Sequence, residues 1–253
     1  FIGVSCGRLG LRAYVPYEYR QFRRAIPLGV ETGWLYGPGD TTIEATLLAI
    51  RQARPGSTAL LTGIVGVKLP TGDSSILDQE EDTNQGQTTS GGHVHGSTGI
   101  TGASSVNLVH PHDLALGSGS YDGVFGVSTY LRGGRFYAIG RVLYDLRSEG
   151  TGGYRCADQW SWGGGPGFYL IFNARGSVGL LANVTGESRG HDQHRGHQVD
   201  DSGITEVFAG PQLSATWAGT SGEIGADLPV VQRVNGQQLA ADYRLHAGVI
   251  IGF

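Results

Sequence analysis

The sequence predicts an all-β protein, a transmembrane antiparallel up-and-down β-barrel, and three observations lead to that fold class. Apolar and polar residues alternate over many segments that are longer than the strands of most soluble proteins. The links between these segments alternate strictly between short and long. No segment of comparable length has a helical period, and no uncharged apolar stretch approaches the ~20 residues of a membrane-spanning helix.

The composition fits this fold class and excludes others. The chain has 253 residues, and its 44 glycines are more than twice the usual share of about 7%. Glycine allows the bends and close packing of a curved, closed sheet. The net charge of −4 argues against a general nucleic-acid-binding protein. The chain lacks methionine, which we interpret as a sign of processing or truncation, and we expect residues 1–253 to form a single barrel domain.

The alternation that predicts strands is clearest over residues 241–253. Leu245, Val249 and Phe253 share one face of this stretch, whereas Asp242 and Arg244 lie on the other. The stretch is longer than the ~9–11 residues with which a tilted strand crosses a bilayer. By the same criterion we expect strands at residues 8–19, 41–52, 58–70, 120–132, 135–148, 158–173, 177–189, 204–217, 222–231 and 240–253.

The links between these strands sort by length. Outer-membrane barrels have short periplasmic turns and longer extracellular loops, and this sequence shows the same sorting. A soluble β-sandwich or jelly roll is the alternative, but such a fold has no reason to sort its links in this way. The short links are 53–57, 133–134, 174–176 and 218–221, and the long links are 20–40, 71–119, 149–157, 190–203 and 232–239.

The start of the chain predicts an incomplete strand. Residues 1–4 have the pattern of a strand end, and residues 5–7 that of a periplasmic turn. Because bacterial single-chain barrels close with an even number of strands, the sequence predicts about 12 strands, with the N-terminal one or two missing or truncated here.

Five short motifs, taken in order along the chain, resemble those of a known family. They are GDTT (39–42), VKLPTGD (67–73), GSGSYD (117–122), GESRG (186–190) and DYRL (242–245). From about Gly7 to Phe253 the chain resembles the outer-membrane channel family named after the MetA pathway of phenol degradation. The resemblance implies a monomeric barrel of about 12 strands that takes up small, mostly hydrophobic molecules.

The polar faces of the predicted strands should line the lumen. These faces carry eight acidic and eight basic residues, which are the charged lumen candidates given below together with Arg8, Arg20, Arg147 and Glu206. Such a balance favours ion pairs across the lumen over an ion-selective pore. About 12 strands enclose a space between the filled interior of ~8 strands and the open channel of ~16–18, so we expect a narrow or loop-plugged pore. These charges either brace the barrel or guide a solute, and the inward aromatic residues are candidates for contacts with an apolar solute. The candidate lumen and constriction residues are Arg12, Tyr14, Glu18, Glu44, Lys68, Asp122, Tyr130, Arg141, Asp145, Tyr169, Glu187, Arg189, Phe208, Asp227, Asp242, Arg244 and His246.

Seven of the eight histidines fall in the predicted extracellular loops. Their HxH and HxxHxxH spacings suit Zn²⁺ or Cu²⁺, while the acidic residues nearby suit Ca²⁺. Neither set matches a closed metal-binding motif, which favours a solvated polar surface loop, with metal binding and the docking of an extracellular partner as alternatives. The candidate metal-binding residues are His93, His95, His110, His112, His191, His194 and His197.

The function expected from these features is passive uptake or diffusion of small molecules, with hydrophobic or aromatic solutes implied by the family resemblance. Loop 71–119 is expected to fold inward as a constriction, since loops of this length are usually functional or disordered. The alternative is an outer-membrane anchor whose His/Asp-rich extracellular loops bind a metal ion or a surface partner protein.

Other expectations concern chemistry and location. The sequence contains no GxSxG, HExxH or phosphate-loop motif, and we expect neither enzyme activity nor a resident cofactor. Cys6 and Cys156 should lie at opposite ends of the barrel and form no disulfide. The expected location is the outer membrane of a Gram-negative bacterium, where a monomer contacts membrane lipid, lipopolysaccharide and a small-molecule solute.

Overall fold

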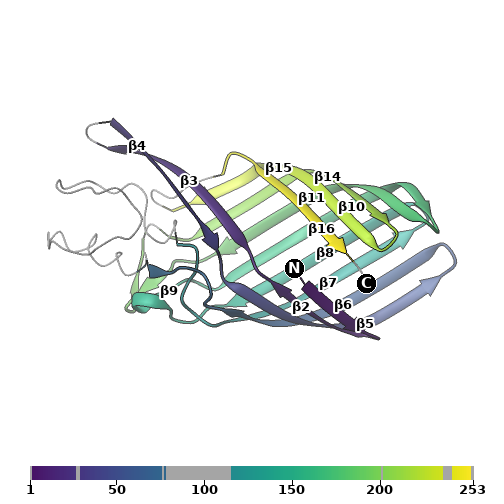
Figure 1. Ribbon diagram of the computed structural model, residues 1–253, viewed down its shortest axis with the longest axis horizontal. Helices are drawn as coiled ribbons and strands as arrows, with labels where there is room; N and C mark the ends of the chain where they lie inside the picture. The colour runs from purple at the N-terminus through teal and green to yellow at the C-terminus, as the bar shows by residue number, and fades with distance from the viewer. Residues whose placement is uncertain are drawn as a thin grey trace.

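Nearly all of the regular secondary structure in the computed structural model is β-strand (Figure 1). The structure describes residues 2–26, 29–75, 77, 115–200, 202–235 and 241–251. These residues contain no α-helix, and Thr151–Gly153 forms a 3-10 turn, labelled η2. A search of the described ranges finds no helix with the length and apolar character needed to cross a membrane. The all-β class predicted from the sequence is confirmed.

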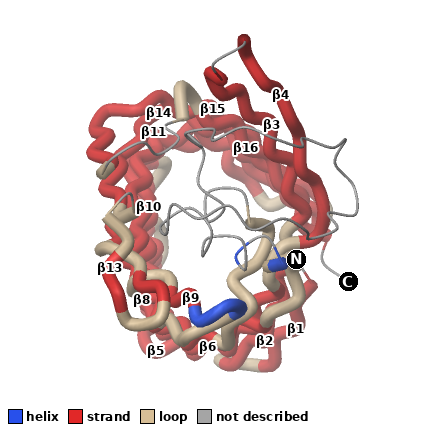
Figure 2. The backbone as a smooth tube through the Cα atoms, turned by 90° about the vertical axis from the view of Figure 1, so that its left-hand side faces the viewer, coloured by secondary structure: helices blue, strands red, loops and turns tan. Residues whose placement is uncertain are grey.

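Eleven antiparallel strands form the main sheet, which curls around a central axis (Figure 2). Their order across the sheet is β1-β2-β5-β6-β7-β8-β10-β11-β14-β15-β16, so strands adjacent in the chain are adjacent in space. The strands are β1 (Ile2–Cys6), β2 (Leu9–Tyr14), β5 (Thr41–Arg54), β6 (Ser57–Leu69), β7 (Asp122–Gly133), β8 (Phe136–Leu146), β10 (Gln159–Asn173), β11 (Gly176–Arg189), β14 (Ile204–Trp217), β15 (Thr220–Val234) and β16 (Arg244–Ile251).

Five two-residue turns lie at one end of this sheet, which we call the short-turn end, and the longer connections lie at the other, the long-loop end (Figure 1). Tight antiparallel turns need residues with positive φ, and Gly56 (81°) and Gly219 (83°) supply them. The predicted sorting of links by length is confirmed. The turns are 7–8, 55–56, 134–135, 174–175 and 218–219.

The polarity of the sheet is the reverse of that in a soluble protein. On the inner face, Glu44 and Asp122 are 3% and 1% exposed. On the outer face, Leu47 and Val127 are 51% and 49% exposed. Polar residues inside and apolar residues outside are the arrangement of strands surrounded by lipid. Other large apolar side chains exposed on the outer face are Leu9, Leu11, Val65, Phe125, Leu180, Leu213, Ile224 and Val249.

The predicted strand at 8–19 and the predicted loop at 20–40 are wrong. Pro16 has no N–H to donate to a neighbouring strand, and the first ladder ends before it. The carbonyl of Pro16 accepts a hydrogen bond from the N–H of Gly39 at 2.9 Å, and a separate two-stranded ribbon begins there. This ribbon projects beyond the long-loop end (Figure 1). Its strands are β3 (Tyr17–Ile26) and β4 (Gly29–Pro38).

The other predicted boundaries agree better with the structure. The seven strands predicted between residues 41 and 217 have their ends within two residues of the observed ones. β15 is longer than predicted, and β16 begins four residues later than predicted, at Arg244. The predicted loops 149–157 and 190–203 contain short strands that form a three-stranded sheet in the order β13-β12-β9. These are β9 (Tyr154–Arg155), β12 (Gln193–His194) and β13 (His197–Gln198).

A small apolar cluster supports this second sheet over the long-loop end. Its members are Leu77, Tyr154 and Val199, and Cys156 packs against them. Asp192, which is 1% exposed, accepts hydrogen bonds from the Tyr154 hydroxyl at 2.7 Å and from the N–H of Ala157 at 2.8 Å. The loops at this end therefore have a folded base of their own.

The edges of the main sheet are β1 and β16, which are not paired with each other within the described residues. β1 corresponds to the strand end predicted at the start of the chain, although it continues to Cys6. The structure thus contains the curled antiparallel sheet of the predicted barrel, whereas closure and a total of about 12 strands remain predictions.

Gly165 in β10 is a position where we expect a side chain to prevent folding. Its φ is +157°, and a Cβ atom there would collide with the carbonyl oxygen of Ala182 on β11. Backbone strain of this kind alone costs about 1–3 kcal/mol. Gly165→Val should therefore abolish the heat-modifiable migration of the refolded protein in detergent. Gly133→Ala is the control, because nothing lies within 4 Å of the added Cβ. If both variants showed the same heat-modifiable migration as the parent protein, this account of β10 would be contradicted.

Candidate functional site: the polar inner face

A chain of charged and polar side chains crosses the inner face near the long-loop end, and we call it the charge belt. It begins at Asp40, just before β5, and passes from strand to strand as far as β14 and β16. Each contact joins a donor to an acceptor, so the charges alternate along the belt. Its members are Asp40, Lys68, Asp122, Asp145, Arg147, Gln159, Glu187, Glu206 and Arg244.

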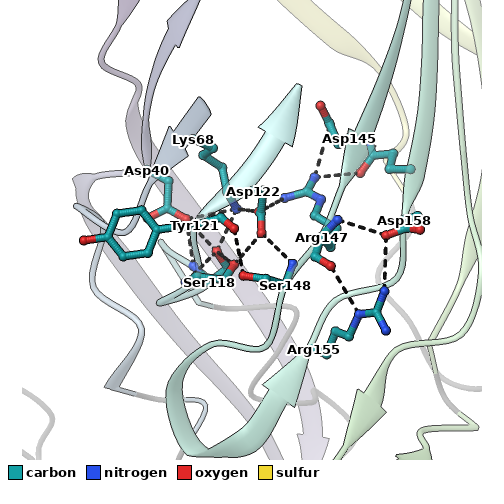
Figure 3. A network of polar contacts seen from close by, with 12 residues as sticks. Asp40, Lys68, Ser118, Tyr121, Asp122, Asp145, Arg147, Ser148, Arg155 and Asp158 are labelled. Atoms are coloured by element: carbon teal, nitrogen blue, oxygen red, sulfur yellow. Dashed lines mark hydrogen bonds and ion pairs between the residues drawn. The ribbon is translucent and has the colours of Figure 1, made fainter. Parts of the chain in front are cut away.

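Lys68 and Asp122 form the centre of the first half of the belt (Figure 3). The Lys68 ammonium lies 2.6 Å from Asp122 Oδ2 and 3.2 Å from Asp40 Oδ2. Asp122 also contacts Arg147 Nη1 at 3.0 Å and accepts hydrogen bonds from Ser120 Oγ and the N–H of Ser148. Two cations and two neutral donors thus compensate one carboxylate that is 1% exposed, which offsets the cost of removing it from water.

The second half of the belt runs through Gln159 to Arg244. Arg147 donates to Gln159 Oε1 at 3.2 Å, and Gln159 Nε2 donates to Glu187 Oε2 at 3.0 Å. Arg244 Nη2 lies 2.7 Å from both Glu187 and Glu206. β15 lies between β16 and β14, so the Arg244 side chain reaches over β15 to contact residues of β14 and β11. Its guanidinium also stacks 3.8 Å above the ring of Phe208, which is fully buried.

The belt also holds the two ends of the long link between β6 and β7. Asp40 accepts hydrogen bonds from the N–H groups of Gly72 and Ser118 at 3.0 and 2.9 Å. The carbonyl of Asp73 accepts the N–H groups of Leu116 and Gly117. Burial alone would raise the pKa of Asp40, but these N–H donors and the charge of Lys68 hold that pKa below its usual value. The predicted inward fold of loop 71–119 concerns mainly residues 78–114, which lie outside the described residues.

Two further acidic residues lie deeper on the inner face. Arg141 on β8 contacts Glu44 on β5 at 2.6 Å across the two strands between them. Asp227 on β15 receives only long contacts, from Asn183 Nδ2 at 3.4 Å and from His246 Nδ1 at 3.5 Å. One carboxylate oxygen of Glu44 and one of Asp227 are buried with no hydrogen-bond partner among the residues that the structure describes. Both residues line the inner cavity, although these two oxygens are not themselves exposed to it.

Aromatic side chains gather on the inner face nearer the short-turn end. The Tyr130 and Tyr169 hydroxyls are 3.0 Å apart, and the rings of Tyr137 and Tyr169 are 4.5 Å apart between centroids. Phe172 packs against Tyr169, and Arg132 stacks on Phe172 at 4.7 Å. We call these five residues the tyrosine cluster; it offers a narrow, amphipathic surface with no acidic member.

The inner face encloses a cavity of about 1190 Å³ that extends from the charge belt to the middle of the sheet. Charged residues such as Glu44 and Arg141 form only part of its wall. Val124, Ile139 and Leu143 supply apolar surface between them. A cavity with this mixed lining suits a small molecule with apolar surface and few polar groups.

The structure shows where the candidate lumen residues lie. The prediction that Glu18 lines the lumen is wrong, because the break at Pro16 places this residue in the β3–β4 ribbon, outside the main sheet. The prediction that Asp242 lines the lumen is also wrong, because this residue precedes β16 and is exposed. Arg189 ends β11 and lies 3.9 Å from Asp192 in the loop base. On the inner face are Arg12, Tyr14, Glu44, Lys68, Asp122, Tyr130, Arg141, Asp145, Tyr169, Glu187, Phe208, Asp227, Arg244 and His246.

Several inner-face residues were missing from the sequence-based candidates. Tyr137 and Asn183 share the strand parity of the charged candidates Arg141 and Glu187, and Gln159 begins the strand that carries Tyr169, so the alternation alone could have identified them. Asp40 lies outside any strand, and only the folded loop ends reveal its role.

The histidines give no metal centre in the described part of the chain. His191 and His194 contact the backbone oxygens of Val199 and Gly152, and His194 and His197 pair across β12 and β13. No group of three potential metal ligands occurs among the described residues. The candidates His93, His95, His110 and His112 lie outside those residues, and the metal prediction is therefore untested.

The two cysteines occupy different environments. Cys6 ends β1 and is exposed, whereas Cys156 lies against the cluster at the long-loop end, and both are free thiols. Burial raises the pKa of the Cys156 thiol, which therefore stays protonated near neutral pH.

Comparison with known proteins supports the fold. No family model and no curated protein matches the chain. The crystal structure of an outer membrane channel from Pseudomonas putida F1 is similar to it, with a TM-score of 0.56 and 14% identity over 97% of this chain and 79% of that chain. The chain has the fold of an outer membrane channel. At this identity the likeness concerns the fold, and the resemblance to the phenol-degradation family remains a prediction from the motifs.

Removing the central cation of the belt should destabilise the protein strongly. Lys68→Met leaves Asp40 and Asp122 with less compensation, and breaking a buried ion pair costs about 3–5 kcal/mol. Urea unfolding in detergent micelles, followed by tryptophan fluorescence, measures the loss. Arg155→Gln is the control, because the Arg155 and Asp158 side chains are partly exposed, 42% and 30%, and a pair of this kind is worth about 0–1 kcal/mol. Comparable losses for the two variants would argue against a central role for Lys68.

The hold of Asp40 on the loop ends should depend on pH. A carboxylate with a lowered pKa stabilises the folded state fully above its usual pKa of 3.8 and loses that effect as pH falls through the lower folded value. Amide exchange at Gly72 and Ser118, corrected for the intrinsic rate, should therefore rise only below about pH 4. In Asp40→Asn the exchange should be higher at neutral pH and show no such step; a step that survives the substitution would assign it to another group.

Proposed function

We propose that this protein is an outer-membrane β-barrel channel of a Gram-negative bacterium through which small, hydrophobic or aromatic molecules diffuse passively. The observation that carries the proposal is the reversed polarity of the sheet, with leucine and valine exposed outside and paired charges around a cavity inside. Strands with this pattern require lipid around them and enclose a polar interior that crosses the membrane.

The direction of the two edges supports closure with 12 strands. In a sheet of eleven strands that are antiparallel throughout, the first and the last run in the same direction. β1 and β16 could pair directly only as parallel strands, whereas one further antiparallel strand between them gives the even number of bacterial barrels, about 12. Exposed strand edges do not occur in lipid, so we propose this closed form for the membrane.

The lengths of the links between strands support one orientation of the barrel in the membrane. We place the short-turn end in the periplasm and the long-loop end outside the cell, as in other outer-membrane barrels. The monomer would contact phospholipid at the periplasmic side and lipopolysaccharide at the outer side.

A solute would then meet two constrictions with a cavity between them. The charge belt closes the outer level through Arg244, whose side chain spans from β16 to Glu187 and Glu206. The tyrosine cluster narrows the periplasmic level. The apolar wall at Val124, Ile139 and Leu143 favours solutes with apolar surface. Passage would need no energy source.

Single-channel conductance in planar bilayers tests the proposal. The protein should give steady conductance that falls when phenol is added, and Arg244→Ala should raise the conductance roughly twofold because it removes the side chain that spans the outer level. Arg175→Ala, in a short turn away from the cavity, should leave it unchanged. Silence from folded, inserted protein, in both the parent and Arg244→Ala, would overturn the channel.

A further inference from the structure

The outer face of the sheet carries a groove that is separate from the inner cavity. At the short-turn end a hollow of 460 Å³ lies across β5 to β8, and a second hollow of 380 Å³ lies across β6 to β11. The two hollows use successive positions of the same strands, Ala59 then Leu61 on β6 and Ala138 then Gly140 on β8. We call the combined feature the outer groove.

Strand register shows that the outer groove faces away from the cavity. Leu131 pairs with Ala59 and Ala138, and Val127 pairs with Val142, so these side chains share one face. Leu131 and Val127 are 48% and 49% exposed, as expected on the convex side. The groove exists because small residues form its floor while large ones flank it. The floor is Ser57, Ala59, Ala138, Gly140 and Gly164, and the flanks are Leu61, Val127, Leu131, Phe136, Val142, Trp162 and Val184.

The mouth of the groove is basic. Arg54 lines it at the short-turn end, together with Gln52 and Ser57. The neighbouring turn brings an exposed Arg135 close, because the N–H of Gly134 donates to the carbonyl of Gly56 at 2.7 Å and ties the two turns together. Neither arginine makes an ion pair within the described residues.

The basic mouth belongs to a wider charge pattern. The short turns and the two residues on either side of each carry five arginines and no acidic residue. The whole chain has a net charge of −4, so the excess of acid lies elsewhere. The five are Arg8, Arg54, Arg132, Arg135 and Arg175. Arg54 and Arg132 line the hollow at the short-turn end, and the strand register places Arg54 on the outer face and Arg132 on the inner face.

We propose that the outer groove is a binding site for one glycerophospholipid of the periplasmic leaflet. The phosphate would contact the Arg54 guanidinium at the mouth, with Arg135 beside it, and one acyl chain would lie over Ala59, Ala138 and Gly140. Charge at one end and a smooth apolar floor beyond it match the two parts of such a lipid. The choice of leaflet rests on the proposed function, which places the short-turn end in the periplasm.

Native mass spectrometry of the detergent-purified protein tests this site, with phosphatidylglycerol and diacylglycerol as probes. We expect one phosphatidylglycerol to be retained, and diacylglycerol to bind about tenfold more weakly because it has no phosphate. Arg54→Gln should weaken phosphatidylglycerol binding about tenfold and leave diacylglycerol unchanged. Arg175→Gln is the matched control, because this arginine lies in another short turn and does not line the outer groove. Equal effects of the two arginine variants would reduce the site to general attraction by the basic turns and overturn it.

A second variant tests the apolar part. Ala138→Leu fills the floor of the groove and should weaken both probes while the protein keeps its heat-modifiable migration. Unchanged binding in this variant would overturn the groove as the acyl site. Competition with purified lipid A tests which leaflet supplies the lipid. If lipid A displaces phosphatidylglycerol from the Arg54 mouth, the assignment of the groove to a lipid of the periplasmic leaflet is overturned. Lipid retention is measured independently of conductance. A protein that shows no conductance but binds phosphatidylglycerol through Arg54 would therefore refute the channel function and leave the lipid site in the groove standing.

Discussion

The structure depends on keeping its charges on one face of a sheet whose other face is apolar. An ion that leaves water pays a desolvation cost of several kcal/mol, which nearby opposite charges and hydrogen bonds must offset. Asp122 shows how this is done, since Lys68 from β6, Arg147 from the end of β8 and two neutral donors converge on it. Because these partners come from different strands, the ion pairs also fix how the strands lie beside one another. The curled shape and the charge belt therefore support each other.

The polar groups at the two ends of the sheet are satisfied in different ways. At the long-loop end, the belt continues into the loops through Asp40, which binds both ends of the link between β6 and β7. The buried Asp192 does the same for the loops that carry β9 and β12. At the short-turn end the chain reverses within two residues, so no loop is available to pair with polar groups. There the inner face is aromatic, and the arginines of the turns face water.

The sequence predicts the faces of the strands better than their partners. Period-two alternation indicates that Glu187, Asp227 and Arg244 share the inner face, because parity is a local property. Partners depend on curvature, which parity does not contain. Arg244 is the cross-strand neighbour of Asp227, yet its guanidinium binds Glu187 and Glu206 further round the sheet. Similarly, the alternation runs through Pro16 without a sign of the break that creates the β3–β4 ribbon, and only the missing N–H of proline explains it.

The wall between cavity and groove is thinnest at β8 and β10. Gly140, Gly163 and Gly164 line the inner cavity and the outer groove at once, so only backbone separates them there. Pro166 lacks an N–H, and the ladder between β10 and β11 has a gap at residues 165–166. The ladder between β8 and β10 is continuous past this point, from Gln159 to Phe168. The separation of a polar interior from the apolar groove therefore rests on the hydrogen bonds of one strand pair rather than on side-chain packing.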